Sequence, residues 1–385
     1  MKQGWEIKRL DDLCQIKTGK KDVNQGNLNG KYPFFTCARE HTFSDSFSFD
    51  TEALLIAGNG DVGNVSYYNG KFEAYQRTYV LFDFVNILPR FLFLILDGTL
   101  KKSMANKKLG NTMPYIKLGM LKEFEIPLPS SLLEQQRIVV VLDEAFAAIA
   151  KAKVNAEQNL KNAKELFESY LQGVFENKLH GSKFETLDSL CELIVDCEHK
   201  TAPTQETGYP SIRTPNIGKG VLILEGVNRV SEKVYNEWTR RAIPQADDLI
   251  LAREAPAGNI AVIPENVKVC LGQRTVLIRP KKNKIVPKFL ALLILSKDVQ
   301  KQLLSHSTGA TVEHINMKDI RAFKIYNLSP LTEQQSIVQK LDALSAETKK
   351  LEAIYQQKIN DLEELKKSVL QKAFSGELKT DKLCV

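Results

Sequence analysis

The sequence lacks the motifs of several enzyme classes. It has no Pro-Pro pair, and therefore no Asp/Asn-Pro-Pro-aromatic motif of an amino-methyltransferase, and no Gly-x-x-x-x-Gly-Lys-Ser/Thr loop of a motor. It has no Cys-x-x-Cys pair, and we expect Cys14 and Cys191 to be buried thiols. No apolar run is long enough to cross a bilayer, and the first residues lack the apolar segment of a signal peptide. We therefore expect a cytoplasmic protein without catalytic motifs.

The main feature that is present is an internal repeat. Residues 121–179 align without a gap on residues 320–378, and 21 of the 59 aligned positions are identical. The preceding segments also match, in the pairs Leu10-Asp11 and Leu187-Asp188, Tyr32-Pro33 and Tyr209-Pro210, and Gln76-Arg77-Thr78 and Gln273-Arg274-Thr275. The offset grows from 177 to 199, so the second copy contains insertions, which in repeats usually lie in loops. A common frame with different loops suits two readers of different targets.

Composition permits this interpretation without requiring it. The 385 residues suffice for two domains with sizeable cores, and the hydrophobic content of 43% is ordinary for a globular protein. The net charge of +7 allows a polyanionic partner.

Residues 1–130 and 181–329 are predicted to be mixed, strand-rich domains. In the first, the pattern predicts strands at 53–56 and 65–68, a hairpin turn at Asn69-Gly70, and a short buried helix from Pro89 to Leu96. In the second, it predicts strands at 249–252 and 260–263 and a helix from Pro287.

Residues 131–180 and 330–385 are predicted to contain long helices, the latter followed by a C-terminal tail. Apolar residues recur in alternating steps of four and three, as in a coiled-coil seam. The predicted seam residues include Ile138, Leu142, Ile149, Leu166, Ile337, Leu341, Leu351, Leu362 and Leu365. The first stripe is rich in alanine and the second in leucine and aromatic residues, so we expect the two helices to pack on each other. A dimerisation arm is the alternative.

Gly58-Asn59-Gly60-Asp61-Val62-Gly63 matches the Gly-x-Gly-x-x-Gly pattern of nucleotide-binding loops. A hairpin is predicted to follow it, however, where a phosphate site needs a helix N-terminus. We therefore expect a tight loop whose backbone approaches a ligand such as DNA. Cys197 and His199 could be metal ligands, but no second pair stands at zinc spacing, and a loop histidine that hydrogen-bonds DNA or backbone is the favoured interpretation.

Several motifs occur in the order of one known family. They are Ile126-Pro127-Leu128-Pro129 followed by Glu134-Gln135-Gln136-Arg137-Ile138-Val139, Asp196-Cys197-Glu198-His199 with Thr201 and Pro203, Ile212-Arg213-Thr214 with Asn216-Ile217, and Leu370-Gln371-Lys372-Ala373-Phe374-Ser375-Gly376-Glu377-Leu378. In this order the chain resembles the specificity (S) subunits of type I restriction-modification systems. One departure is Tyr326-Asn327-Leu328-Ser329, which replaces the Pro-Leu-Pro of residues 127–129.

The resemblance implies an α/β (α+β) fold. Two target-recognition domains would lie in an inverted arrangement, separated by two long helices that form an antiparallel coiled coil. It also implies a non-catalytic DNA-recognition subunit. Each domain would read one half of a bipartite, asymmetric site on double-stranded DNA, and the helices would set the gap and dock two methyltransferase subunits. Those partners would use S-adenosylmethionine, no cofactor is expected in this chain, and restriction subunits could join. The alternatives are a coiled-coil protein-interaction scaffold and an orphan DNA-binding specificity protein without an endonuclease.

Candidate DNA-binding residues are those whose side chains suit DNA. Arginine pairs with guanine and asparagine with adenine, while lysine, arginine and hydroxyl groups contact phosphates. The candidates are Lys17, Thr18, Lys20, Lys21, Arg39, Asn59, Arg77, Lys101, Lys107 and Lys108 in the first domain, and His199, Lys200, Thr201, Arg213, Thr214, Asn216, Lys219, Arg253 and Arg274 in the second. Arg77 and Arg274 are repeat-equivalent, and domains that read different sequences should not share base contacts. They are therefore candidates for phosphate or scaffold contacts.

Overall fold

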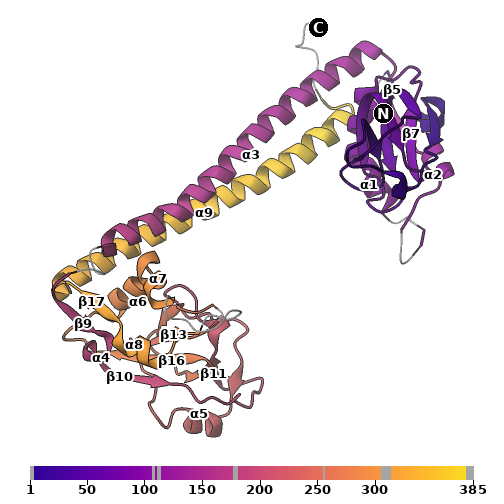
Figure 1. Ribbon diagram of the computed structural model, residues 1–385. Coiled ribbons are helices and arrows are strands. Elements are labelled where there is room, and N and C mark those ends of the chain that lie inside the picture. Colours follow the sequence, from indigo (N-terminus) through magenta and orange to yellow (C-terminus); the bar gives the residue numbers. More distant parts are fainter. Residues whose placement is uncertain are drawn as a thin grey trace. The chain divides into compact units, whose positions relative to one another are not determined.

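The computed structural model describes residues 4–105, 109–110, 114–176, 181–254, 256–304 and 314–378 (Figure 1). The chain divides into two compact units. The first unit comprises residues 1–157 and 356–385, and the second comprises residues 158–355. Each unit therefore contains one β-rich domain and parts of two long helices. Among the described residues, no helix is both long enough and apolar enough to cross a membrane.

The domain of the first unit is built on a mixed sheet. In its described part the strand order is β2-β7-β5-β6-β3-β4, and neighbours are antiparallel except β3 and β6. The strands are β2 (Gln15–Thr18), β3 (Tyr32–Phe35), β4 (Thr42–Ser44), β5 (Phe49–Ala57), β6 (Val65–Ala74) and β7 (Thr78–Phe82). A separate antiparallel pair, β1 (Trp5–Arg9) and β8 (Glu125–Pro129), joins the two ends of the domain.

Helix α1 (Pro89–Met104) packs on this sheet, and α2 (Leu118–Lys122) follows it. Pro89 occupies the first helical position, where proline costs no hydrogen bond. The helix was predicted to end near Leu96, but it continues because Leu100 and Met104 are also buried in the core.

The predicted turn at Asn69-Gly70 is wrong. Both residues lie inside β6, where they pair with Glu52 and Thr51 of β5. Gly70 has a φ of 128°, which a glycine tolerates within a strand. The strand continues past it because Phe72 is fully buried, and the true turn of this hairpin is the glycine-rich loop at 58–64.

The second unit repeats this frame. Its four-stranded sheet, among the described residues, has the order β10-β16-β13-β14, which matches β2-β7-β5-β6. A separate pair β9–β17 matches β1–β8. These strands are β9 (Phe184–Thr186), β10 (Cys191–Asp196), β13 (Leu249–Ala252), β14 (Ile260–Val262), β16 (Thr275–Pro280) and β17 (Lys324–Tyr326). Strand β13 coincides with its predicted range, and β14 ends one residue before its predicted end.

The insertion in the second copy adds a helix. Between β11 (Tyr209–Ile212) and β13 the chain forms β12 (Arg229–Val230), which pairs antiparallel with β11 as β4 does with β3, and α5 (Glu232–Trp238), which has no helical counterpart between β3 and β5. Strands β12, β11 and β15 (Cys270–Leu271) form their own small sheet. The remaining helices are α4 (Leu187–Leu190), α6 (Pro287–Leu295), α7 (Lys297–Leu304) and α8 (Met317–Ala322). Helix α6 begins at Pro287, as predicted.

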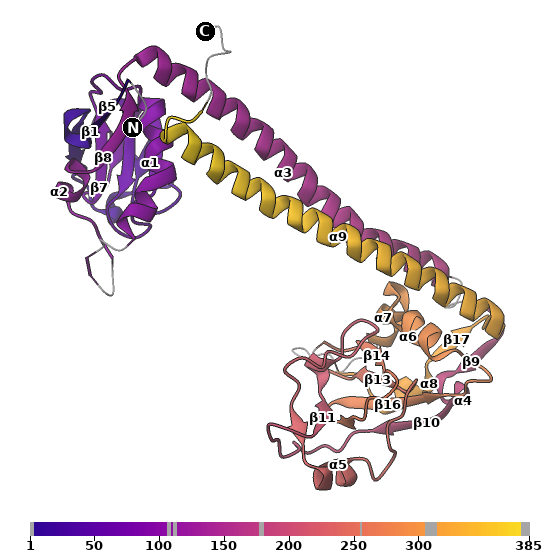
Figure 2. The ribbon, with the colours of Figure 1, turned by 180° about the vertical axis from the view of Figure 1, so that it is seen from behind.

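The two long helices, α3 (Leu132–Phe175) and α9 (Leu331–Phe374), each have 44 residues and run side by side in Figures 1 and 2. In the first unit, Lys153 of α3 pairs with Glu363 of α9, and Ala373 joins the core that contains Ile138. Residue numbers thus rise along one helix as they fall along the other, and the helices are antiparallel there. In the second unit, Leu171 and Leu341 share one core.

Only part of the predicted seam is buried. Ile138, Leu142 and Leu341 are buried, Ile149, Ile337 and Leu362 are half-buried, and Leu166, Leu351 and Leu365 are exposed. A strict heptad drifts by about 20° per repeat relative to a straight helix. On α3 the buried stripe accordingly moves from the predicted Leu166 to Phe167 and Leu171.

Each domain also packs on the end of the long helix from the other repeat. Phe91 of α1 meets Phe374 of α9 with ring centroids 6.1 Å apart, and Phe289 of α6 meets Phe175 of α3 at 5.2 Å. Phe91 and Phe289 are both fully buried. The repeat therefore reproduces an individual contact as well as a fold.

The prediction of buried thiols is confirmed for Cys14 and Cys191. Burial raises the pKa of each thiol to about 12, so both remain protonated at neutral pH. Neither thiol is therefore a nucleophile.

Candidate nucleic-acid interface

In the first unit, four loop segments converge beside the sheet. The carbonyl of Arg77 accepts hydrogen bonds from the Gly58 amide at 3.0 Å and from the Cys37 thiol at 3.3 Å. The amide of Gly19 donates to Thr78, and that of Gln76 donates to Lys21. Segments 19–21, 36–39, 58–61 and 75–78 are therefore held together, although they lie far apart in the sequence.

The glycine-rich loop belongs to this cluster. Gly60 and Gly63 have φ values of 62° and 81°, which favour glycine. The amides of Asp61 and Gly63 donate to the carbonyls of Cys37 and Ala57, so they are already used within the protein. The loop is itself the turn between β5 and β6, so it leads into a strand, but the hairpin predicted to follow it with a turn at Asn69-Gly70 is not formed. A nucleotide-binding loop would instead lead into a helix.

The first-domain candidates differ in their surroundings. Lys21 donates to Ser44 and Ser46 and pairs with Glu73, whose side chain is buried. Lys101 pairs with Asp61, and Asn59 is buried. Lys101 is exposed, as are the candidates Lys17, Thr18, Lys20, Arg39 and Arg77. Lys107 and Lys108 lie outside the described residues.

Arg39 borders a small polar cavity of about 30 Å³ together with His41, Asn64 and Ser66. A cavity of this size has room for about one water molecule, which suits a water-mediated contact beside the exposed arginine.

The second unit builds the equivalent cluster with the same backbone bond. The amide of Arg253 donates to the carbonyl of Arg274 at 2.9 Å, as that of Gly58 does to Arg77. The amide of Cys197 donates to Thr275, matching the Gly19–Thr78 bond. The frame is therefore common to both units, whereas most of the side chains on it differ.

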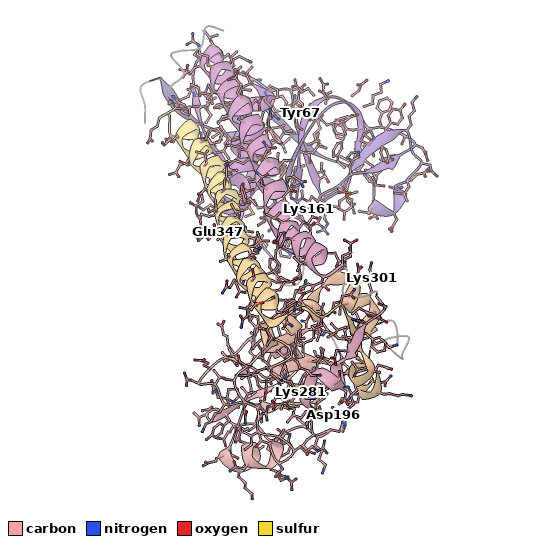
Figure 3. All side chains as sticks on the ribbon, turned by 90° about the vertical axis from the view of Figure 1, so that its left-hand side faces the viewer. Tyr67, Lys161, Asp196, Lys281, Lys301 and Glu347 are labelled. Atoms are coloured by element: carbon pink, nitrogen blue, oxygen red, sulfur yellow. The ribbon has the colours of Figure 1, made fainter. Side chains whose placement is uncertain are left out.

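Arg253 is buried at the centre of a charged network in this cluster. Its Nη1 donates to Asp196 Oδ2 at 2.6 Å, its Nε donates to the carbonyl of Ile315, and its Nη2 lies 2.8 Å from His314 Nε2. Asp196 stands at the end of β10 and is labelled in Figure 3. The guanidinium therefore links three segments, and each of its three nitrogens has a partner inside the protein.

His314 and Glu254 extend this network to the surface. Arginine is only a donor, so His314 Nε2 accepts from Arg253 and its Nδ1 donates to Glu254 Oε1 at 2.7 Å. Glu254 Oε2 then pairs with Arg274 Nε at 2.8 Å. His314, Glu254 and Asp196 were missed as site residues because they act through contacts more than 55 positions apart in the sequence, which no local pattern reveals.

The other second-domain candidates are either exposed on the surface or bonded within the protein. His199, Lys200, Thr201 and Arg213 are exposed, and His199 lies 3.3 Å from Asp196. Asn216 folds the loop: its Oδ1 accepts from the Arg213 amide, and its Nδ2 donates to Ile223. Thr214 is buried, and Lys219 pairs with Glu168 of α3.

The model of the type I restriction modification DNA specificity domain matches residues 2–160 and again residues 181–364. The chain belongs to this family. The double match follows the internal repeat, and it confirms the resemblance inferred from the motifs.

Relatives of this specificity-domain chain cover nearly its whole length. The EcoDI specificity subunit of Escherichia coli is 28% identical, over 97% of this chain and 88% of that protein. The MjaVIII specificity subunit of Methanocaldococcus jannaschii is 23% identical, over 99% of this chain and 94% of that protein.

Two solved structures share the fold. The HsdS subunit from Thermoanaerobacter tengcongensis superposes with a TM-score of 0.64 at 18% identity, over 98% of each chain. A chain from a structure described as showing complex assembly and conformational transition of the type I R-M system gives a TM-score of 0.74 at 18% identity, over 98% of this chain and 99% of that one. The expected mixed α/β fold, with two β-rich domains and two long helices packed together, is confirmed. The chain is a DNA specificity subunit, a non-catalytic part of a type I restriction-modification enzyme complex.

Proposed function

We propose that each unit reads one half of a bipartite, asymmetric site on double-stranded DNA. The observation that supports this is the pair of equivalent loop clusters, which share the bonds Gly58–Arg77 and Arg253–Arg274 but differ in most of their side chains. Two identical readers would recognise identical half-sites. Different side chains on one frame give each half-site its own sequence.

Within each cluster, exposure separates contact residues from supporting residues. Lys101 and Lys219 are exposed but paired with Asp61 and Glu168. We assign DNA contact to nine other exposed candidates: Lys17, Thr18, Lys20, Arg39, Arg77, His199, Lys200, Thr201 and Arg213. Lys21, Arg253 and Asn216 are engaged within the protein, so they hold the loops that carry these contacts. Arg274 is exposed but paired with Glu254, which favours a phosphate or scaffold role over base contact.

The helices provide the second part of the proposal. Residues 1–130 and 181–329 would be the recognition domains, and residues 131–180 and 330–385 the spacers that set the gap between half-sites. Leu166 and Leu365 are repeat-equivalent on α3 and α9, and each is 49% exposed. Equivalent apolar positions on both spacers suit the docking of two copies of one partner. That partner would be a methyltransferase subunit that uses S-adenosylmethionine, and restriction subunits could join the assembly.

The function is tested by mapping methylated adenines across the genome in cells with and without this chain. A partner methyltransferase gene and its expression are kept constant in both. We expect one split motif to lose its methylation when the chain is absent. An unchanged methylation pattern in cells that express the partner would contradict the proposal.

Arg213→Ala is expected to weaken binding to the cognate site by about 1–3 kcal/mol and to leave nonspecific binding nearly unchanged. The Arg213 side chain is exposed beside Gly272, while its backbone is fixed by Asn216. Arg240→Ala, an exposed arginine at the end of α5, is the matched control. Titration of the protein with cognate and with scrambled DNA at one salt concentration measures the specific and the nonspecific dissociation constants. An equal loss on every sequence would make Arg213 a phosphate contact.

A further inference from the structure

A buried glutamine joins the first domain to the start of α3. Gln135 is 0% exposed. Its Oε1 accepts from the amide of Leu88 at 2.9 Å, and its Nε2 donates to the carbonyls of Asn86 and Pro129 at 3.2 and 3.1 Å. Leu88 caps α1, and Pro129 ends β8. One side chain therefore ties the helix, the loop before α1 and the last strand together.

The second unit contains the same joint. Gln334 is also 0% exposed. Its Oε1 accepts from Val286 at 2.8 Å, and its Nε2 donates to Lys284 and Ser329 at 3.2 and 2.7 Å. The joint survives although Ser329 belongs to the segment that departs from the Pro-Leu-Pro sequence. What the repeat retains is the set of three bonds.

Nearby ion pairs cross the same two junctions. Arg90 of α1 pairs with Asp143 of α3 at 2.7 Å, and Lys288 of α6 pairs with Asp342 of α9 at 2.7 Å. These pairs are exposed and contribute little stability on their own. They lie further along the same helices as the glutamines, so polar contacts at two positions add to the apolar packing between each domain and its helix.

Directional bonds fix an angle more tightly than apolar packing does. Each glutamine has its amide group satisfied by three backbone atoms from two segments, the stretch before the short helix and the stretch before the long helix. A buried amide that lost these partners would incur a desolvation cost. A tilt of about 10° would move a surface some 20 Å away by about 3.5 Å, roughly one base-pair step. Small changes at the joint therefore matter for a reader of DNA.

We propose that Gln135 and Gln334 are positioning residues that fix the orientation of each recognition domain on the helix that follows it. They thereby restrict the complex to one gap between half-sites. This inference rests on the proposed function, in which the helices set that gap.

The test uses the full chain assembled with its methyltransferase subunits. Gln135→Met and Gln334→Met remove the hydrogen bonds with little change in volume, and the adjacent exposed Gln136→Met and Gln335→Met are the matched controls. Methylation is measured on DNA that keeps both half-sites and varies the gap by one or two base pairs. We expect each buried-site variant to lower the preference for the cognate gap about tenfold, with the base preference of each half-site unchanged. The controls should keep the wild-type preference.

Other outcomes distinguish failure of this inference from failure of the proposed function. If a variant loses methylation equally at all gaps, the glutamines stabilise the fold only, and the inference fails. If the Met variants do not assemble, Gln135→Glu and Gln334→Glu replace them, since glutamate keeps the shape and an acceptor oxygen but removes both N–H donors. The measurement is again methylation at the cognate gap relative to methylation at the altered gaps. If the wild-type complex accepts all gaps equally, or if deleting four residues from an exposed stretch of a helix leaves the gap unchanged, the proposed function itself is wrong.

Discussion

Exchange of residues 181–329 for the corresponding segment of another type I specificity subunit is expected to change one half of the methylated DNA site and to leave the other half unchanged. Strands β9 and β17, near the two ends of the segment, pair with each other. Both junctions of a graft therefore lie close together in the structure. The loop cluster of the second unit lies wholly within it, apart from contacts to α3 such as that of Lys219 with Glu168.

The donor segment should keep an aromatic residue at the position of Phe289, which packs on Phe175 of the recipient helix. Long-read mapping of methylated adenines gives the new motif directly. The reciprocal exchange of residues 5–129 is the control and should alter the other half alone. A graft that changed both halves would mean that the two domains do not read independently.

Phe289→Ala is expected to destabilise the second unit by about 3–5 kcal/mol, the usual cost of emptying a fully buried phenylalanine site. Phe289 is 0% exposed, and its ring closes the contact between α6 and the end of α3. The chain has two tryptophans, Trp5 and Trp238, one in each unit. In a Trp5→Phe background, the urea dependence of Trp238 fluorescence therefore reports on the second unit.

Phe184→Ala is the matched control, because Phe184 is 48% exposed and should cost far less. Phe91→Ala, followed through Trp5 in a Trp238→Phe background, should repeat the result in the first unit. Equal urea midpoints for Phe289→Ala and Phe184→Ala would be incompatible with the packing described above.

The sequence predicted correctly those helices and strands that are determined by their own residues. Strand β13 consists entirely of buried apolar residues, and α6 begins at a proline followed by an apolar run, so both were found at their observed starts. The repeat also predicted that the two domains share a frame, since it could be read directly from the sequence.

The errors arose where distant contacts override a local preference. Asn69-Gly70 favours a turn in isolation, but pairing with β5 and the burial of Phe72 keep the strand intact. The strict heptad placed Leu351 and Leu365 in the seam, whereas both are exposed. The network around Arg253 joins residues that only the fold brings together, so no local pattern could predict it.

The two phenylalanine contacts have a consequence for shorter relatives of this chain. In each contact, the short helix of one repeat meets the long helix of the other: Phe91 with Phe374, and Phe289 with Phe175. A polypeptide with a single copy, one domain and one long helix, could complete this contact only with a second identical molecule. Two such molecules would form an isologous homodimer, since each would give and receive the same contact. Its two reading surfaces would be identical, so its DNA site would be palindromic. Duplication within one chain removes that constraint and lets the two half-sites diverge.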